Sequence, residues 1–257
     1  MMTFRVLTTV FKMHLKQIFT DLFFLFGTVL QPIIFAVLNY YMQKTRGVVN
    51  IHEIIAGSTM MGLWTSSLFG TASAINWERS SGTLELLVGT PTPLWQITVG
   101  KALANSTLVL ISPLVLIAAN HIFGDSDGTF RSHFWVFVIS CLSGVVGSLV
   151  LGFLMAPLFS LEFRLMGWIN AMEYPVFILA GFLFPAELLP VWLRFLSYAL
   201  PPYWSVRAIR SSVLNPWLAV TETFVGLGLS LIYFGLARRL FKVFIEKAFT
   251  SGTLGFE

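Results

Sequence analysis

The segment NWERSSGTLELLVGTPTP (residues 76–93) is polar and punctuated by glycine, and long apolar runs flank it on both sides. Asn76 can cap a short helix whose first turn carries Glu78, because the helix dipole favours an acid there. Residues 80–82 break that helix, and residues 83–88 offer a second helical turn. The segment therefore predicts short, stiff helices with acidic and apolar faces. These helices either dock on another protein or pack as an ordinary loop on their own helix ends.

The composition of the chain is that of an integral membrane protein. Of its 257 residues, 56% are hydrophobic and only 11% are charged, whereas roughly a quarter of the residues of a soluble domain are charged. The mean hydropathy is +0.80. The net charge of +4 does not indicate nucleic-acid binding, because the basic residues lie in the short segments between apolar blocks. The single cysteine, Cys141, can form no intrachain disulfide.

The apolar blocks predict an all-α membrane protein that forms a single transmembrane domain, residues 1–257. A membrane-spanning helix needs about 20 mostly apolar residues. Six segments qualify, at about 22–42, 54–75, 97–119, 134–159, 168–185 and 216–237. Residues 1–20 carry apolar and basic side chains on separate faces, which predicts an interfacial helix lying on the membrane; a frayed cytoplasmic tail is the alternative.

Prolines interrupt the apolar stretch that follows the fifth span. Pro190, Pro201 and Pro202 lie too close together for a regular spanning helix. Residues 186–210 are therefore expected to form a re-entrant or interfacial element whose free backbone groups are covered by neighbouring protein.

The basic residues set the orientation. With the N-terminus inside, ten Lys and Arg residues lie on the inner side and six on the outer side. Arg238, Arg239 and Lys242, directly after the last span, are the clearest inside marker. Six spans then predict a multi-pass protein with both termini and residues 76–93 in the cytoplasm, and with the re-entrant element outside.

The sequence contains little that points to catalysis. No G-x-x-x-x-G-K-[ST] loop is present, so we expect the chain to bind no ATP by itself. None of the four histidines has a helical partner at metal-ligand spacing. We therefore expect a transport protein without a metal or a cofactor of its own. An intramembrane enzyme and an ATP-independent channel are the alternatives from other classes.

Two segments resemble the type-2 ABC transporter permease family. ERSSGTLELLVGTP is similar to the E-R-x-x-G-T-L-E-x-L-x-x-T-P pattern that follows the second span in that family. GFLFPAELLPVWLRFLSYALPPYWSVRAIR (residues 181–210) resembles the extracellular re-entrant element of the same family. The interfacial helix, the spans, the polar loop and the re-entrant element occur in the family's order, so the resemblance covers essentially the whole chain.

The resemblance implies that residues 76–90 form a coupling helix seated in a cleft of a separate ATPase subunit, which would bind ATP and Mg²⁺. The coupling candidates are Glu78, Arg79, Gly82, Thr83, Leu84, Glu85 and Leu87. Charged residues at such an interface fix register and orientation, and a rigid helix passes a rigid-body displacement into the membrane. Two ATPase chains and a second permease chain, identical or homologous, would complete the transporter in the bacterial cytoplasmic membrane.

Six residues in predicted spans are candidates for the translocation path: Gln31, Phe35, Asn39, Asn170, Glu173 and Phe177. A charged side chain at the bilayer centre costs about 2.5–3.5 kcal/mol and usually faces a cavity or a partner. Glu173 is therefore either functional, or a structural hydrogen-bonding or interfacial residue. The three residues of the first span share one face, which either lines a path or makes polar contacts between helices.

The resemblance implies export, and the mostly apolar and aromatic path candidates favour a small amphipathic or hydrophobic cargo such as a drug, a peptide or a lipid. A polysaccharide or a lipid-linked glycan is the alternative, because aromatic side chains also stack on sugars.

Overall fold

The computed structural model describes residues 2–20, 26, 30–45, 47, 49–109, 134–160 and 165–251. This part of the chain is helical and contains no strand. Large parts of the predicted first and third spans, residues 22–25, 27–29 and 110–119, lie outside the described residues. The all-α prediction is confirmed for the part that the structure describes.

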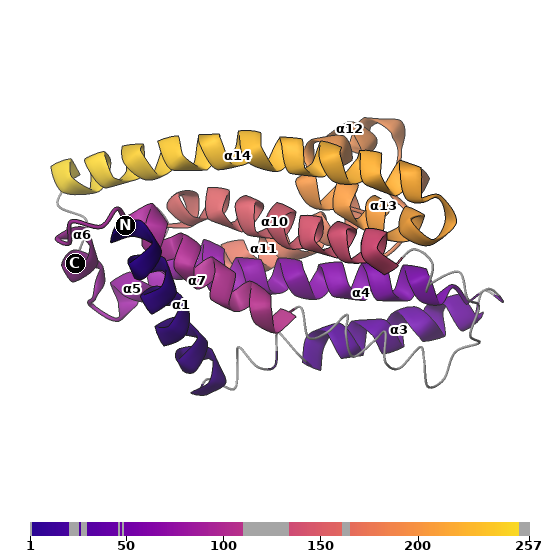
Figure 1. Cartoon of the computed structure of the whole chain (residues 1–257), viewed down its shortest axis with the longest axis horizontal. Coiled ribbons are helices and arrows are strands. Elements are labelled where there is room, and N and C mark those ends of the chain that lie inside the picture. The colour runs from indigo at the N-terminus through magenta and orange to yellow at the C-terminus, as the bar shows by residue number, and fades with distance from the viewer. Residues whose placement is uncertain are drawn as a thin grey trace.

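Long helices run side by side along the longest axis of the molecule (Figure 1). They are α3 (Gln31–Thr45), α4 (Ile51–Ser66), α10 (Phe134–Phe159) and α14 (Pro216–Ser251), with α7 (Leu94–Val109) and α11 (Leu165–Leu179) beside them. Among the described residues, two helical segments are long and apolar enough to cross a membrane, Phe134–Phe159 and Pro216–Glu246. The first of these has the predicted bounds.

Two helices end at residues that differ from the predicted span ends. The last helix continues to Ser251 rather than ending near residue 237, because basic residues lower the hydropathy without breaking the helix. Arg238 lies over the ring of Trp95, 4.8 Å from its centroid, which keeps this charged part of α14 against the bundle. The fifth predicted span ends at Leu179 rather than residue 185, because Gly181 adopts the left-handed φ of +75° that closes a turn.

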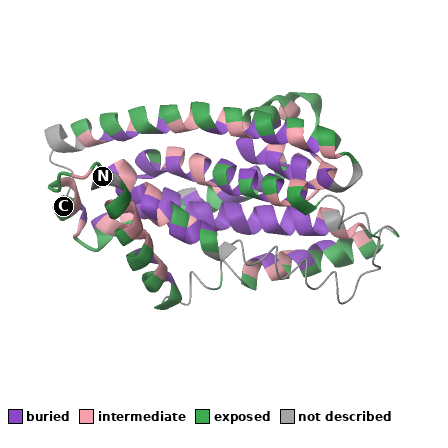
Figure 2. Ribbon diagram, in the orientation of Figure 1, coloured by how far each residue is buried: buried purple, intermediate pink, exposed green. Residues whose placement is uncertain are grey.

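Helix α4 lies at the centre of the bundle and is buried along almost all of its length (Figure 2). It continues into a π-helical turn, η2 (Ser67–Ala72). Helix α10 approaches it closely through glycines: a Cβ atom at Gly144 would lie 2.6 Å from the sulfur of Met60, and one at Gly152 would overlap Ser67. The hydroxyl of Ser67 donates to the carbonyl of Ser148 at 2.6 Å. These glycines therefore permit the close packing of α10 on this part of the bundle.

Further helices lie at both ends of the bundle (Figure 1). At one end, α1 (Met2–Thr20) runs across the long helices and packs on α7, next to α5 (Ala74–Ser80) and α6 (Leu84–Val88). The opposite end holds η3 (Ala186–Leu188), α12 (Val191–Ala199) and α13 (Pro201–Leu214). The two segments that carry the family resemblance therefore lie at opposite ends of the molecule.

The amphipathic pattern of α1 matches its packing. Ile18 is buried against Ala104 of α7, with Phe11 and Leu15 packed beside it. The basic residues Arg5, Lys12 and Lys16 are exposed, and so are the apolar side chains of Phe4, Met13 and Phe19. Such a helix has one face for the bundle and further apolar surface for a membrane interface.

The prolines of the predicted re-entrant element begin helices rather than simply breaking them. Pro190 is the N-cap residue of α12, and Pro201 is the first residue of α13. Proline suits the first helical turn because its missing N–H has no intrahelical partner to lose.

Candidate functional site

The α5–α6 unit, residues 74–88, is two short helices joined by a Schellman turn. The N–H of Thr83 donates to the carbonyl of Glu78 at 2.9 Å, and the N–H of Gly82 donates to the carbonyl of Arg79 at 3.0 Å. Gly82 has a φ of +68°, a left-handed conformation that favours glycine over residues with a side chain. The Gly-Thr pair of the sequence motif thus fixes the angle between α5 and α6.

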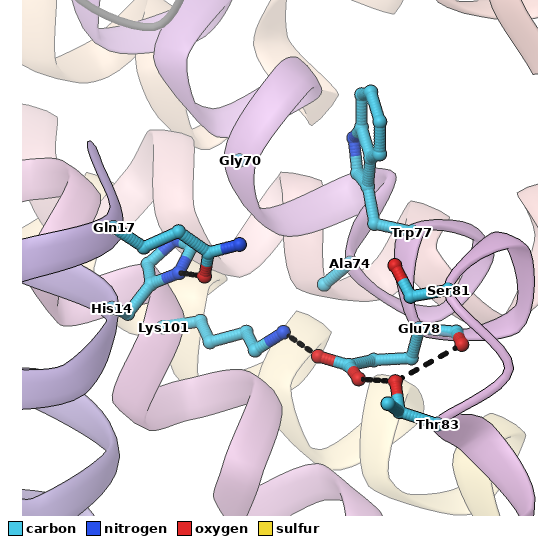
Figure 3. A pocket seen from close by; sticks show the side chains of 9 residues that line it. All are labelled: His14, Gln17, Gly70, Ala74, Trp77, Glu78, Ser81, Thr83 and Lys101. Carbon is cyan, nitrogen blue, oxygen red and sulfur yellow. Dashed lines mark hydrogen bonds and ion pairs between the residues drawn. The ribbon is translucent and has the colours of Figure 1, made fainter. Parts of the chain in front are cut away.

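The carboxylate of Glu78 turns inward, toward the bundle. It pairs with the ammonium group of Lys101 on α7 and accepts a hydrogen bond from the hydroxyl of Thr83 (Figure 3). Burial raises the pKa of Glu78, but the hydrogen bond and charge of Lys101 outweigh it, so the pKa is below its ordinary value. Glu78 is therefore an ionised group that fastens α5 to α7.

Arg79 and Asn76 turn toward the C-terminal end of α10. The guanidinium of Arg79, only 8% exposed, donates from Nη1 to the carbonyl of Ser160 at 2.7 Å. The amide of Asn76 donates to the carbonyl of Phe159 at 2.9 Å. These two side chains satisfy carbonyls that the end of α10 leaves without a helical partner.

The expectation that Asn76 caps its own helix is wrong. Helix α5 begins at Ala74, so Asn76 lies inside it. Its side chain bonds to α10 instead, because the π-helical turn before Ser73 extends the helical chain up to α5 with only a one-residue break.

Helix α6 separates its residues into an inner and an outer face. Leu84 is fully buried against the aromatic residues Phe153 and Phe241, and Leu87 packs beside it. Glu85 and Leu86 point outward, and Leu86 is 73% exposed. Leu86 is missing from the coupling candidates chosen from the sequence, although the spacing of the buried leucines at 84 and 87 places residues 85 and 86 on the opposite face.

A buried histidine joins α1 to this region. The Nε2 atom of His14 lies 3.2 Å from Oδ1 of Asn105 on α7, and its Nδ1 atom lies 3.3 Å from Oε1 of Gln17. Burial lowers the pKa of His14, and the nearby charge of Lys101 lowers it further. The imidazole fixes α1 to α7, the helix whose Lys101 pairs with Glu78.

The structure brings together four of the six path candidates, Gln31, Phe35, Glu173 and Phe177. The carboxyl group of Glu173 on α11 is 5% exposed and accepts hydrogen bonds from Gln31 of α3 at 3.2 Å and from Thr65 of α4 at 2.7 Å. The rings of Phe35 and Phe177 meet edge to face at 5.5 Å. These contacts join three helices around one carboxyl group.

Asn39 and Asn170 flank this cluster differently. Asn39 is buried beside Gly57 of α4, whereas Asn170 is exposed on α11. Thr65, which makes the shorter hydrogen bond to Glu173, was not predicted. A threonine in an apolar helix is a weak signal, because its hydroxyl often bonds to its own backbone.

The opposite end of the bundle contains a second ion pair. Nε of Arg207 lies 2.9 Å from Oε1 of Glu222, and its Nη1 atom donates to the hydroxyl of Tyr203 at 3.0 Å. Arg210 donates to the carbonyl of Gly181 at 2.7 Å. Arginines of the predicted re-entrant element thus fasten α13 to α14 and to the turn after α11.

A model of the ABC-2 type transporter family matches residues 5–214 of the chain. The match covers the α1 helix, the α5–α6 unit, the Glu173 cluster and α13. The chain belongs to the ABC-2 type transporter family, and it is a helical permease of the membrane-embedded type. The resemblance seen in the sequence is confirmed.

Two curated relatives have similar sequences. The protein named "Probable multidrug ABC transporter permease YbhR" of Escherichia coli K12 is 28% identical over 154 residues, which is 59% of this chain and 39% of the relative. The protein of the same name in Escherichia coli O157:H7 matches with the same identity and coverage. The match thus spans about two fifths of the length of the curated relatives.

Proposed function

We propose that the chain is the permease subunit of an ATP-driven exporter, and that the α5–α6 unit is the coupling helix that seats in a cleft of a separate ATPase subunit. The observation that carries this proposal is that some side chains of the unit face the bundle and others face outward. Glu78 and Arg79 hold it rigidly on α7 and α10, while Glu85 and Leu86 face outward. A rigid unit whose outer face presents the exposed Leu86 beside the polar Glu85 suits a docking site for a water-soluble protein.

In this proposal Glu78 and Arg79 transmit movement rather than contact the ATPase, and Glu85 is the charged residue of the motif that faces it. A displacement of α5 would pull on α7 through Lys101 and on α10 through the carbonyl of Ser160. Because α5 also follows the π-helical turn at the end of α4, the same displacement reaches α4, whose Thr65 holds Glu173. The partner subunit would supply ATP and Mg²⁺, and two ATPase chains and two permease chains would form the transporter.

The proposed cargo is a small amphipathic or hydrophobic molecule. The cluster around Glu173 offers one carboxyl group, neutral hydrogen-bond donors and two aromatic rings. Such a set suits a mostly apolar molecule with a single polar or basic group. The printed name of the curated relatives, a multidrug permease, agrees with this cargo class. The proposal places the chain in a bacterial cytoplasmic membrane with both termini and the α5–α6 unit on the cytoplasmic side.

The test is gentle purification of the chain from its native membrane, followed by mass spectrometry of the proteins that co-purify in stoichiometric amount. We expect a soluble chain with a phosphate-binding loop, lost when Glu85 is changed to Lys and Leu86 to Asp together. A chain that purifies alone after chemical crosslinking would contradict the proposal.

A further inference from the structure

A cavity of about 410 Å³ lies where α1, α5 and α7 meet (Figure 3). Its wall includes Gln17 of α1, Trp77 and Glu78 of α5, Lys101 of α7, and Ser81 in the turn after α5. The volume falls in the range of about 300–1,000 Å³ typical of small-molecule sites. The interactions described above do not fill this space.

The cavity presents both signs of charge. Lys101 and Glu78 extend toward each other from opposite walls and pair within it (Figure 3). The imidazole of His14 is on the same wall as Gln17 and is neutral near pH 7, because burial and the charge of Lys101 lower its pKa. A cavity with one cation, one anion and little net charge matches a ligand that carries both charges itself.

We propose that this cavity binds the ammonium–phosphodiester headgroup of a zwitterionic phospholipid. A lysine ammonium group carries three donors, so Lys101 can bind the phosphodiester while it remains paired with Glu78. The ammonium group of the lipid donates to the carboxylate of Glu78 and lies near the indole of Trp77, which lines the same cavity. The hydroxyl of Ser81 supplies a further polar contact at the exposed rim.

The surroundings of the cavity favour a lipid over a soluble zwitterion. Helix α1, which forms one wall, exposes Phe4, Met13 and Phe19 as well as basic side chains. A helix of this kind lies at the boundary between headgroups and acyl chains. A headgroup in the cavity would leave its acyl chains at the depth where these apolar side chains lie.

A bound headgroup would contact the interfacial helix, the α5–α6 unit and α7 at the same time. It would therefore stabilise the position of the Glu78 carboxylate by a contact in addition to the hydrogen bond from Thr83. The lipid becomes a structural part of this end of the molecule, and it is separate from any cargo that reaches the Glu173 cluster.

The test is native mass spectrometry of the full chain released from nanodiscs that contain equal amounts of phosphatidylethanolamine and phosphatidylglycerol. We expect the wild-type chain to retain phosphatidylethanolamine selectively. Trp77→Ala removes the indole, and Ser81→Trp places a large side chain over the exposed rim. Each should lower this retention about tenfold, the loss expected for a desolvated cation–π contact or a blocked site.

Trp217→Ala is the matched control, because Trp217 on α14 is 80% exposed and does not line the cavity. It should retain phosphatidylethanolamine as the wild type does. Equal retention of the two lipids, or unchanged retention in both cavity variants, would overturn the proposal. Binding of soluble glycerophosphoethanolamine to the delipidated chain as tightly as the lipid would overturn the assignment to a lipid.

Discussion

The two ends of the helical bundle are built from similar parts. Each has short helices and a glycine in the left-handed region, Gly82 at one end and Gly181 at the other. Each also has an acid paired with a basic residue of another helix, namely Glu78 with Lys101 and Glu222 with Arg207. The similarity shows that ion pairs across helices fix short segments at both ends.

The surfaces of the two ends differ. Helix α6 exposes Leu86 beside the polar Glu85, whereas α12 exposes Val191, Trp192 and Phe195 together. A single apolar side chain in a polar surface suits a water-soluble partner. A broad apolar face suits lipid or other membrane protein. The difference teaches that the internal ion pairs do not distinguish the ends, and that the exposed faces of α6 and α12 do.

The largest expected effect is that of Glu78→Lys, compared with the same change of glutamate to lysine at the opposite end of the molecule. Glu78→Lys places two ammonium groups against each other in a largely buried site, so we expect a loss of about 3 kcal/mol in the free energy of unfolding. ATP-dependent transport in reconstituted vesicles should be abolished. At the other end, Glu187→Lys disturbs only a largely exposed pair with Arg207 at 3.7 Å and should change stability by less than about 0.5 kcal/mol.

Thermal unfolding in detergent and transport in vesicles measure both quantities. Equal destabilisation by the two lysine variants would show that the Glu78–Lys101 pair does not fasten α5.

The second expected effect comes from the carboxyl group of Glu173, and it does not involve the charge of Glu78. Glu173→Gln keeps an oxygen that can accept from Thr65 and Gln31, so the melting temperature should change little. Loss of the carboxyl group should lower transport of a basic amphipathic dye about tenfold, since a hydrogen bond to a charged group contributes about 1.5–3 kcal/mol. Unchanged transport with unchanged expression would assign Glu173 a purely structural role.

The third effect compares two left-handed glycines, Gly82 and Gly181. A Cβ atom at Gly82 meets nothing within 4 Å, whereas one at Gly181 lies 3.2 Å from the backbone nitrogen of Ala186. Gly82→Ala should therefore cost only the backbone strain, about 1 kcal/mol, and Gly181→Ala about 2–3 kcal/mol. Chemical denaturation of the two variants in the same detergent measures the difference. A larger loss for Gly82→Ala would contradict the open geometry of the turn after α5.

The smallest effect is a pH dependence at the α1–α5 end. Because the folded-state pKa of His14 is below its unfolded value of 6.5, its contribution to stability is complete above pH 6.5 and is lost as the pH falls toward the folded value. Glu78 has a lowered pKa too, so its contribution is present above pH 4.5 and is lost below it. Melting temperatures measured from pH 8 down to well below pH 4 should show two steps, and His14→Gln should remove only the upper one. Persistence of the upper step in that variant would exclude His14 as its source.

Much of the fold could be predicted from local patterns. The apolar run of α10 has the predicted bounds. The placement of basic and apolar residues on separate faces predicted the helix α1. The end of α14 was missed because hydropathy falls at Arg238 while helix propensity does not. Hydropathy therefore identifies apolar segments better than it identifies helix ends.

The candidate site could be predicted only in part, because its partners lie far apart in the sequence. The motif identified the α5–α6 unit, but the inward direction of Glu78 and Arg79 depends on Lys101 and on the carbonyl of Ser160. No local pattern contains those contacts. The exposed position of Leu86 follows from helical spacing once Leu84 is known to be buried.

The most direct test of the central claim is a comparison of Leu86→Asp with Leu188→Asp. The two leucines are 73% and 70% exposed and lie at opposite ends of the molecule. The measurement is the amount of ATPase subunit that co-purifies with each variant. Because Leu86 is the exposed apolar side chain of α6, we expect its variant to lose the ATPase subunit and the Leu188 variant to retain it. Retention by the Leu86 variant, or equal loss from both, would contradict the assignment of the α5–α6 unit as the docking element.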